Sequence, residues 1–202
     1  NGTAAEITTL LGNEGTTGNT VGLDGNFTMT VSSGQATVTQ VNTMSDFSTT
    51  GAITATISDT GIATLEGLST GSADQLTITV ASTSATAAQL KAVGDATGLN
   101  VTATAVEAIT NSSVAQVKSL LTDEGSTGDK VNLDGNFTVA INDTGTVDAA
   151  DLNTINSATS GLVTAKGVAT LTGTASAITT LIGNEGNSGD KVNLDGDFAI
   201  TI

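Results

Sequence analysis

A segment of 29 residues occurs three times in this chain, and it restricts the possible folds more than any other feature. The copies cover residues 3–31, 113–141 and 174–202. The first and third copies align without a gap at an offset of 171 residues, with 17 identical positions. The second and third align at an offset of 61, with 13 identical positions. Such repetition indicates similar structural units that pack against their neighbours in sequence order.

Each copy opens with a helical pattern. A Ser or Thr precedes apolar residues spaced three and four apart, which lie on one face of a helix, and Ser and Thr are favoured N-caps. The predicted N-caps are Thr3, Ser113 and Thr174. Weaker versions of the pattern lie at 37–44, 59–68, 84–93 and 146–155. The sequence therefore predicts seven short helices.

Each unit closes with a strand pattern, in which apolar residues alternate with polar ones, most often threonine. Equivalent positions at 28, 54, 77, 102, 138, 164 and 199 are separated by 28.5 residues on average. We therefore predict an α/β solenoid, a parallel β-solenoid of about seven coils that is β-rich overall, with one short helix per coil. The predicted coils, within a single repeat domain over 1–202, are 3–35, 36–58, 59–83, 84–111, 112–145, 146–173 and 174–202.

The spacing of the two kinds of element conflicts in such a fold. Stacked strands lie roughly 4.8 Å apart, whereas packed helices need about 8–10 Å between their axes. Either the stack curves with its helices outside, or the helices are short and partly replaced by turns. We favour short helices, because each helical pattern covers only a few turns.

The charge of the chain argues against one class of partner. The net charge is −15, with five Lys and no Arg, so phosphate backbones would be repelled and nucleic acid is not an expected partner. No apolar run reaches the length of a membrane span, and no signal peptide is recognised at the start. Because residue 1 is Asn rather than Met and the last strand stops at Ile202, we expect a processed product or part of a longer protein.

The composition also argues against catalysis. The chain has no His, Cys or Tyr, which removes most of the usual general bases and nucleophiles. Pairs of carboxylates can hydrolyse glycosides, but the acidic residues here recur in every copy, whereas an active site is normally present once. We therefore expect no enzymatic activity.

An acidic turn motif recurs in the three copies. Leu-Asp-Gly, then Asn or Asp, then Phe occurs at 23–27, 133–137 and 194–198. It indicates a tight turn, either a β-hairpin or a corner between strands. The alternative is a calcium site built from oxygen ligands, although the EF-hand spacing and the glycine-rich calcium repeat are both missing. The candidate ligands are Glu14, Asp24, Asn26, Glu124, Asp129, Asp134, Glu185, Asp190, Asp195 and Asp197.

Threonines in Thr-x-Thr pairs form a second candidate site. Stacked on successive coils, they would make a flat ladder of hydroxyl and methyl groups that could bind ice, but threonine is also simply a favourable strand residue. The candidate residues are Thr28, Thr30, Thr54, Thr56, Thr77, Thr79, Thr102 and Thr104.

The repeats resemble those of a known group of proteins. Residues 161–181, the Ala-Asp-Leu-Asn-Thr-Ile stretch at 150–155 and Thr-Gly at 172–173 resemble the repeat arrays of giant cell-surface, adhesin-like proteins of marine cyanobacteria and related bacteria. In those arrays a helix and a Thr-Gly-bounded strand alternate. The resemblance implies an extracellular or cell-surface location and a structural or adhesive role rather than an enzymatic one. The acidic turn motif lies outside the resemblance.

Together these observations predict a structural segment that stacks end to end into a filament, stalk or sheath. The first helix and the last strand lack the polar caps that repeat proteins need at their ends. We therefore expect the partner to be the protein itself, head to tail, either as the continuing chain or as the next subunit. The alternative is a calcium-stabilised binding module that recognises a glycan or ice, for which calcium would be the only cofactor.

Overall fold

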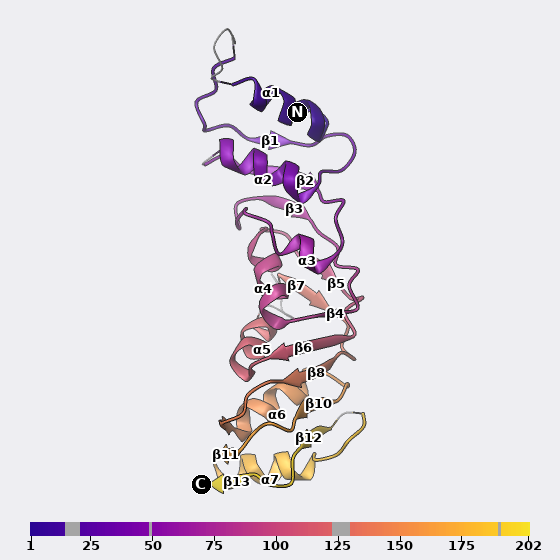
Figure 1. Ribbon diagram of the computed structural model, residues 1–202, viewed down its shortest axis with the longest axis vertical. Helices are drawn as coiled ribbons and strands as arrows, with labels where there is room; N and C mark the ends of the chain where they lie inside the picture. Colours follow the sequence, from indigo (N-terminus) through magenta and orange to yellow (C-terminus); the bar gives the residue numbers. More distant parts are fainter. Residues whose placement is uncertain (15–20, 49, 123–129, 190) are drawn as a thin grey trace. The chain divides into compact units, whose positions relative to one another are not determined.

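The computed structural model describes residues 1–14, 21–48, 50–122, 130–189 and 191–202 (Figure 1). The chain divides into two compact units, each described here by itself. Unit 1 comprises residues 1–81 and 92–102, and unit 2 comprises residues 82–91 and 103–202.

Among the described residues one helix occurs in each of the seven predicted repeats, so the seven helix predictions are confirmed. In order they are α1 (Ala4–Gly12), α2 (Val38–Phe47), α3 (Ile62–Leu65), α4 (Ala87–Asp95), α5 (Val114–Leu121), α6 (Ala149–Ser157) and α7 (Ala175–Gly183). Within unit 1, α1 packs against α2; within unit 2, α6 packs against both α5 and α7. Helices of neighbouring repeats therefore lie side by side.

The helices α1, α5 and α7 begin where the sequence predicts, because their first residues are capped by side chains. The N–H of Glu6 donates to Thr3 Oγ1 at 3.2 Å, and the N–H of Thr3 donates back to the Glu6 carboxylate at 2.8 Å. The same capping box occurs in α2 and α5 with Gln in place of Glu6. Ser113 and Thr174 cap α5 and α7, so all three predicted N-caps are confirmed.

Unit 1 contains one small parallel sheet. Its strands β1 (Met29–Thr30), β2 (Ile53–Thr56) and β3 (Gln75–Thr77) come from three successive repeats and lie in that order. Met29 lies opposite Ile53, and Ala55 lies opposite Leu76. These apolar side chains are buried, as the alternating pattern predicts. A further strand, β5 (Val101–Ala103), follows α4.

Unit 2 contains two parallel sheets. The larger has the order β12 (Val192–Leu194), β10 (Val163–Ala165), β8 (Thr138–Ile141), β6 (Ala108–Ser112) and β4 (Ser84–Ala85). The smaller has the order β13 (Ala199–Thr201), β11 (Thr170–Thr172) and β9 (Thr146–Asp148). The remaining strand of this region, β7 (Val131–Leu133), lies in neither sheet.

The predicted β-rich parallel solenoid is wrong. The protein is a mixed α/β fold whose strands are only two to five residues long and are divided among small sheets. Equivalent segments do not stay in one ladder: β12 joins the five-stranded sheet, whereas β7, with the same Val-Asn-Leu sequence, lies outside it. The conflict between helix spacing and strand spacing offers a physical reason for such small sheets, because packed helices need more room than the paired strands of neighbouring repeats.

Neighbouring repeats are joined by a hydroxyl, a carbonyl and a glycine. In unit 1, Ser48 Oγ donates to the Phe27 carbonyl oxygen at 2.7 Å; in unit 2, Thr159 Oγ1 donates to the Phe137 carbonyl oxygen at 2.5 Å. A Cβ on the nearby Gly161 would lie 2.2 Å from that carbonyl oxygen. Glycine is needed here because its missing side chain lets the two backbones approach.

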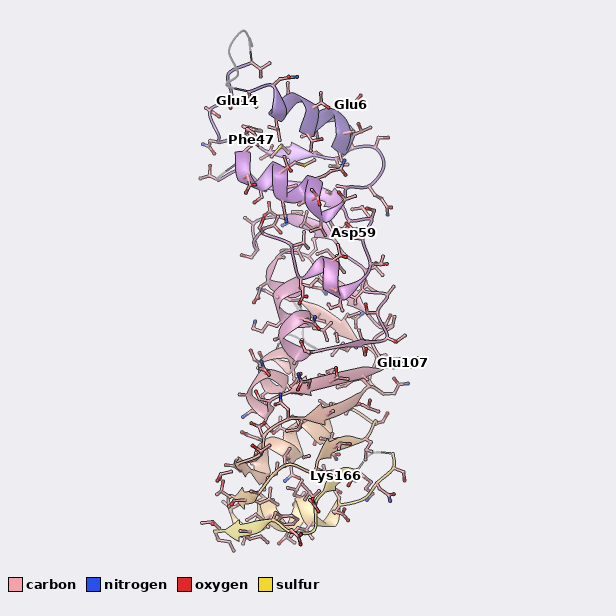
Figure 2. The ribbon with its side chains drawn as sticks, viewed as in Figure 1. Glu6, Glu14, Phe47, Asp59, Glu107 and Lys166 are labelled. Atoms are coloured by element: carbon pink, nitrogen blue, oxygen red, sulfur yellow. The ribbon has the colours of Figure 1, made fainter. Side chains whose placement is uncertain are left out.

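The starts of two helices are also bound by aspartates that lie 21 and 29 residues later in the sequence, of which Asp59 belongs to the following repeat. The N–H of Val38 donates to Asp59 Oδ2 at 2.7 Å, and the N–H of Val114 donates to Asp143 Oδ2 at 2.6 Å. Figure 2 labels Asp59 beside the ribbon, along with Glu6 on α1. These bonds satisfy helix N–H groups that have no partner within their own helix, and a carboxylate is favourable near a helix N-terminus.

Replacing Gly161 with Ala tests the close approach of repeats. We expect a loss of roughly 1–3 kcal/mol in the unfolding free energy of unit 2, because the new methyl group overlaps the Phe137 carbonyl. Urea denaturation followed by circular dichroism measures it. The matched control is Gly183→Ala in α7, where a Cβ meets nothing within 4 Å and stability should hold or rise. Equal effects in the two variants would contradict the role of Gly161.

The capping box of α1 predicts a pH dependence. Hydrogen bonds from the backbone N–H of Thr3, and then from its hydroxyl, lower the pKa of Glu6. A carboxyl whose pKa is lowered by folding stabilises the fold above its unfolded pKa, and that contribution is lost as the pH falls through the folded pKa. We therefore expect α1 to fray in acid, below about pH 4, as measured by the Cα chemical shifts of residues 4–12. Glu6→Gln, which copies the Gln40 box of α2, should remove this dependence; fraying at the same pH in that variant would assign it to other carboxyls.

Candidate functional site

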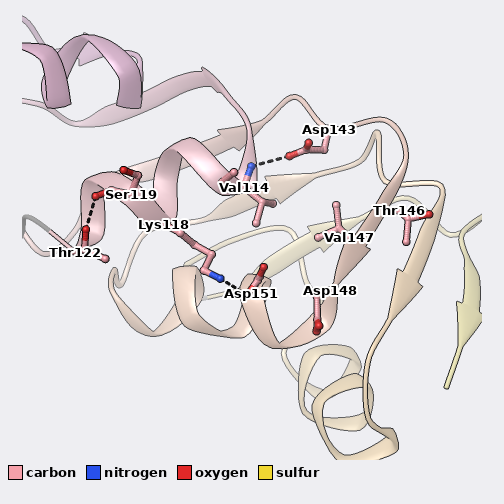
Figure 3. Close-up of a pocket in the computed structure, with 10 residues that line it drawn as sticks. Val114, Lys118, Ser119, Thr122, Asp143, Thr146, Val147, Asp148 and Asp151 are labelled. Carbon is pink, nitrogen blue, oxygen red and sulfur yellow. Dashed lines mark hydrogen bonds and ion pairs between the residues drawn. The ribbon is translucent and has the colours of Figure 1, made fainter.

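A shallow groove of about 570 Å³ lies between α5 and α6 in unit 2 (Figure 3). The Lys118 ammonium lies 2.5 Å from an Asp151 carboxylate oxygen, and both side chains are partly exposed. Such an ion pair contributes about 0–1 kcal/mol. It bridges two helices that pack together.

The other carboxylates of this groove are engaged by the backbone. Asp143 accepts the Val114 N–H, and Asp148 Oδ1 accepts the Ala150 N–H at 2.8 Å, which caps α6. Each of these charged groups on the groove wall therefore holds one repeat to another or caps a helix. The charged groups of this groove make structural contacts, and they are not arranged as an acid, a base and a nucleophile.

A second groove, of about 590 Å³, runs beside the last strand of unit 2. Thr201 and Ile202 form one wall, and Thr172, Ala175 and Ala177 contribute to the rest. Ile200 and Ile202 are exposed here, as is Ile182 on α7. We call the surface made by Ile182, Ile200 and Ile202 the α7–β13 face. Sequence analysis missed it, because these residues follow the same pattern as buried ones.

The acidic motif forms corners rather than hairpins. In the third copy the turn at 195–197 joins β12 to β13, which belong to different sheets, so the two strands cannot pair as a hairpin. In the first copy Asp24 Oδ1 accepts the Asn26 N–H at 3.0 Å, and Gly25 has a φ of 73°. The carboxylate thus closes the turn, and the glycine takes the left-handed conformation that other residues avoid.

The calcium candidates are distributed among these corners. Glu14 is half-buried at the end of α1, and Asn26 Oδ1 accepts a hydrogen bond from Thr50. The candidates Asp24, Asp134, Glu185, Asp195 and Asp197 are exposed. Glu124, Asp129 and Asp190 lie outside the described residues. Among the residues that the structure describes, no three His, Cys, Asp or Glu side chains converge on a metal position, and the calcium site stays a prediction.

The candidate threonines are on the surface, and Thr30 alone among them is half-buried. The strand register of unit 1 brings six of them together in pairs, Thr30 with Thr54, Thr56 with Thr77, and Thr79 with Thr102. Thr54 lies opposite Gln75 on its other side, so the first pair does not continue into a longer row. Thr28 lies before β1, and Thr104 belongs to unit 2.

Two further findings, one on the helices and one on known proteins, bear on function. In the described ranges, no helix is both long and apolar enough to cross a membrane. Comparison with protein-family models, curated proteins and solved structures finds no match to this chain. The assignment of function therefore rests on the residues and contacts above.

Calcium binding at the acidic corners makes a testable prediction. A ligand that binds only the folded state raises the melting temperature, so millimolar calcium should raise it relative to EDTA. The variant Asp24→Asn/Asp134→Asn/Asp195→Asn should abolish the shift. A control that removes three exposed carboxylates elsewhere, Asp46→Asn/Glu66→Gln/Glu107→Gln, should keep it. The absence of any shift, or an equal loss in both variants, would reject a corner site.

Proposed function

We propose that this chain is a non-enzymatic structural segment that associates end to end into a filament, stalk or sheath outside the cell. One observation carries the proposal: strand β13 has β11 on one edge and no strand partner on its other edge in the described part of the chain. All three of its residues are exposed, and they include Ile200.

An edge of this kind favours association. An unpaired strand edge presents N–H and C=O groups that another strand can pair with. Exposed isoleucines add a hydrophobic driving force of about 25 cal/mol for each Å² of apolar surface removed from water. Inside the chain, neighbouring repeats already associate in this way, by parallel strand pairing and by helix packing.

The contacts of the polar side chains support a structural role. Ser48 and Thr159 bind carbonyl groups of the preceding repeat, and Asp59 binds an N–H group of it. Asp143 binds the first N–H group of α5 within its own repeat. Asn153 Nδ2 donates to the Ala177 carbonyl oxygen of the following repeat at 2.9 Å. Apart from Asp143, these groups are used to join repeats. The resemblance to cell-surface repeat arrays supports the extracellular location.

The proposal predicts concentration-dependent self-association of the purified chain. The net charge of −15 opposes contact between molecules, and salt screens this repulsion over distances beyond about 8 Å at 0.15 M. We therefore expect larger assemblies at 0.3 M NaCl than at 0.02 M. Sedimentation velocity gives the sizes, and negative-stain electron microscopy shows whether they are linear. A single monomeric species at every concentration and salt level would reject the proposed function.

A further inference from the structure

The first and third copies of the repeat allow a matched comparison. Helices α1 and α7 have the closely similar sequences AAEITTLLG and ASAITTLIG. Their neighbours differ: α1 packs against α2, the helix that follows it, and α7 packs against α6, the helix that precedes it. The two helices therefore show how the exposure of equivalent side chains depends on which neighbouring helix is present.

Two apolar positions of this helix change places between the copies. Leu10 of α1 is 45 % exposed, whereas its counterpart in α7, Leu181, is 0 % exposed. Leu11 of α1 is 1 % exposed, whereas its counterpart, Ile182, is 45 % exposed. The Leu10 position is thus buried when a preceding repeat is present, and the Leu11 position is buried when a following repeat is present.

Helix α2, which has neighbours on both sides, follows the same rule. Met44 occupies the Leu10 position, counted from the N-cap, and is fully buried. Ser45 occupies the Leu11 position, and its Oγ donates to the Ser69 carbonyl oxygen of the following repeat at 3.2 Å. One edge of each helix therefore faces the preceding repeat and the other edge faces the following one.

The strands show the same difference. Met29, in β1, is 4 % exposed beside β2, whereas its counterpart Ile200, in β13, is 47 % exposed. Strand β2, from the following repeat, covers one side of β1, and β13 lacks a strand of this kind in the described part of the chain. In the first copy, where a following repeat is present, the counterparts of Ile182 and Ile200 are buried, and the counterpart of Ile202, Val31, is half-buried.

We propose that a second copy of this chain covers the α7–β13 face, with its α1 packed on α7 so that Leu10 of one molecule meets Ile182 of the next. This inference rests on the proposed function and specifies the contact between two successive molecules, which we call the joint. Helix α1 offers the edge that α7 buries against α6, and α7 offers the edge that α1 buries against α2. The joint thus repeats between molecules the packing used within the chain.

The chemistry of the two helices fits this partner. Helix α7 has no charged residue, and Glu6, the only charge of α1, is held by Thr3. The hydroxyls of Thr8 and Thr180 donate to carbonyl oxygens of their own helices, at 2.9 and 3.0 Å. Packing at these positions therefore leaves the Thr8 and Thr180 hydroxyls and the Glu6 carboxylate with hydrogen-bond partners. Because two different surfaces meet, the contact is heterologous and continues from molecule to molecule, into a filament where the rotation does not close a ring.

Complementary variants test the joint. Leu10→Glu blocks the α1 edge, and Ile182→Glu blocks the α7 edge; both side chains are exposed, so each variant should fold, as circular dichroism can verify. We expect each variant alone to be monomeric under conditions in which the unmodified chain assembles. An equimolar mixture should form heterodimers and nothing larger, because only one intact pair of edges remains. Sedimentation velocity distinguishes these species. Ala88→Glu, at an exposed position of α4, adds the same charge elsewhere and should assemble like the unmodified chain.

A cross-link gives a second readout. The chain has no cysteine, so the variant Leu10→Cys/Ile182→Cys should form a ladder of disulfide-linked oligomers on oxidation, which reduction reverses. Assembly that survives either glutamate variant, or a mixture that stays monomeric, would overturn this joint while leaving end-to-end association in place. An unmodified chain that never assembles would instead reject the proposed function and this joint with it.

Discussion

The fold depends on the contact that each repeat makes with the next one along the chain. The repeats are too small to enclose a core of their own, so a helix such as α2 buries Val41 and Met44 and uses Ser45 to bind the following repeat. Hydroxyl–carbonyl bonds from Ser48 and Thr159 then fix the distance between backbones. Removing one neighbour leaves an aliphatic surface exposed, as at Leu10 and Ile182.

This dependence also explains the role of the polar residues. In a chain so rich in Thr, Asn and Asp, many side chains could compete with the backbone for hydrogen bonds. Here they close helix starts, as Thr3 and Asp143 do, or reach the next repeat, as Asn153 does. Polar groups used in this way do not need an active site to account for them. The same use supports a structural rather than a catalytic role.

The acidic corners and the threonine pairs show that repeated sequence does not by itself predict which residues stack on each other. Repeated residues are expected to stack only if every repeat advances by the same amount. In unit 1 Thr30 faces Thr54 but Thr54 faces Gln75, and in unit 2 Val139 and Val192 both face Val163 although they come from different parts of their copies. Equal sequence therefore did not mean equal position in the sheets.

The sequence by itself determined where the seven helices of the described residues lie, the caps at Thr3, Ser113 and Thr174, and most of the strand residues that are buried, although not Ile200 and Ile202. These features depend on residues a few positions apart: a Thr three residues before a Glu, apolar residues at helical spacing, or alternation along a strand. Only the tertiary structure decided which sheet each strand joins and that the acidic motif is a corner. It also decided that Leu10 and Ile182 are the exposed apolar side chains of α1 and α7. Those outcomes depend on the register between whole repeats and on the presence of a neighbour, and no local pattern contains either.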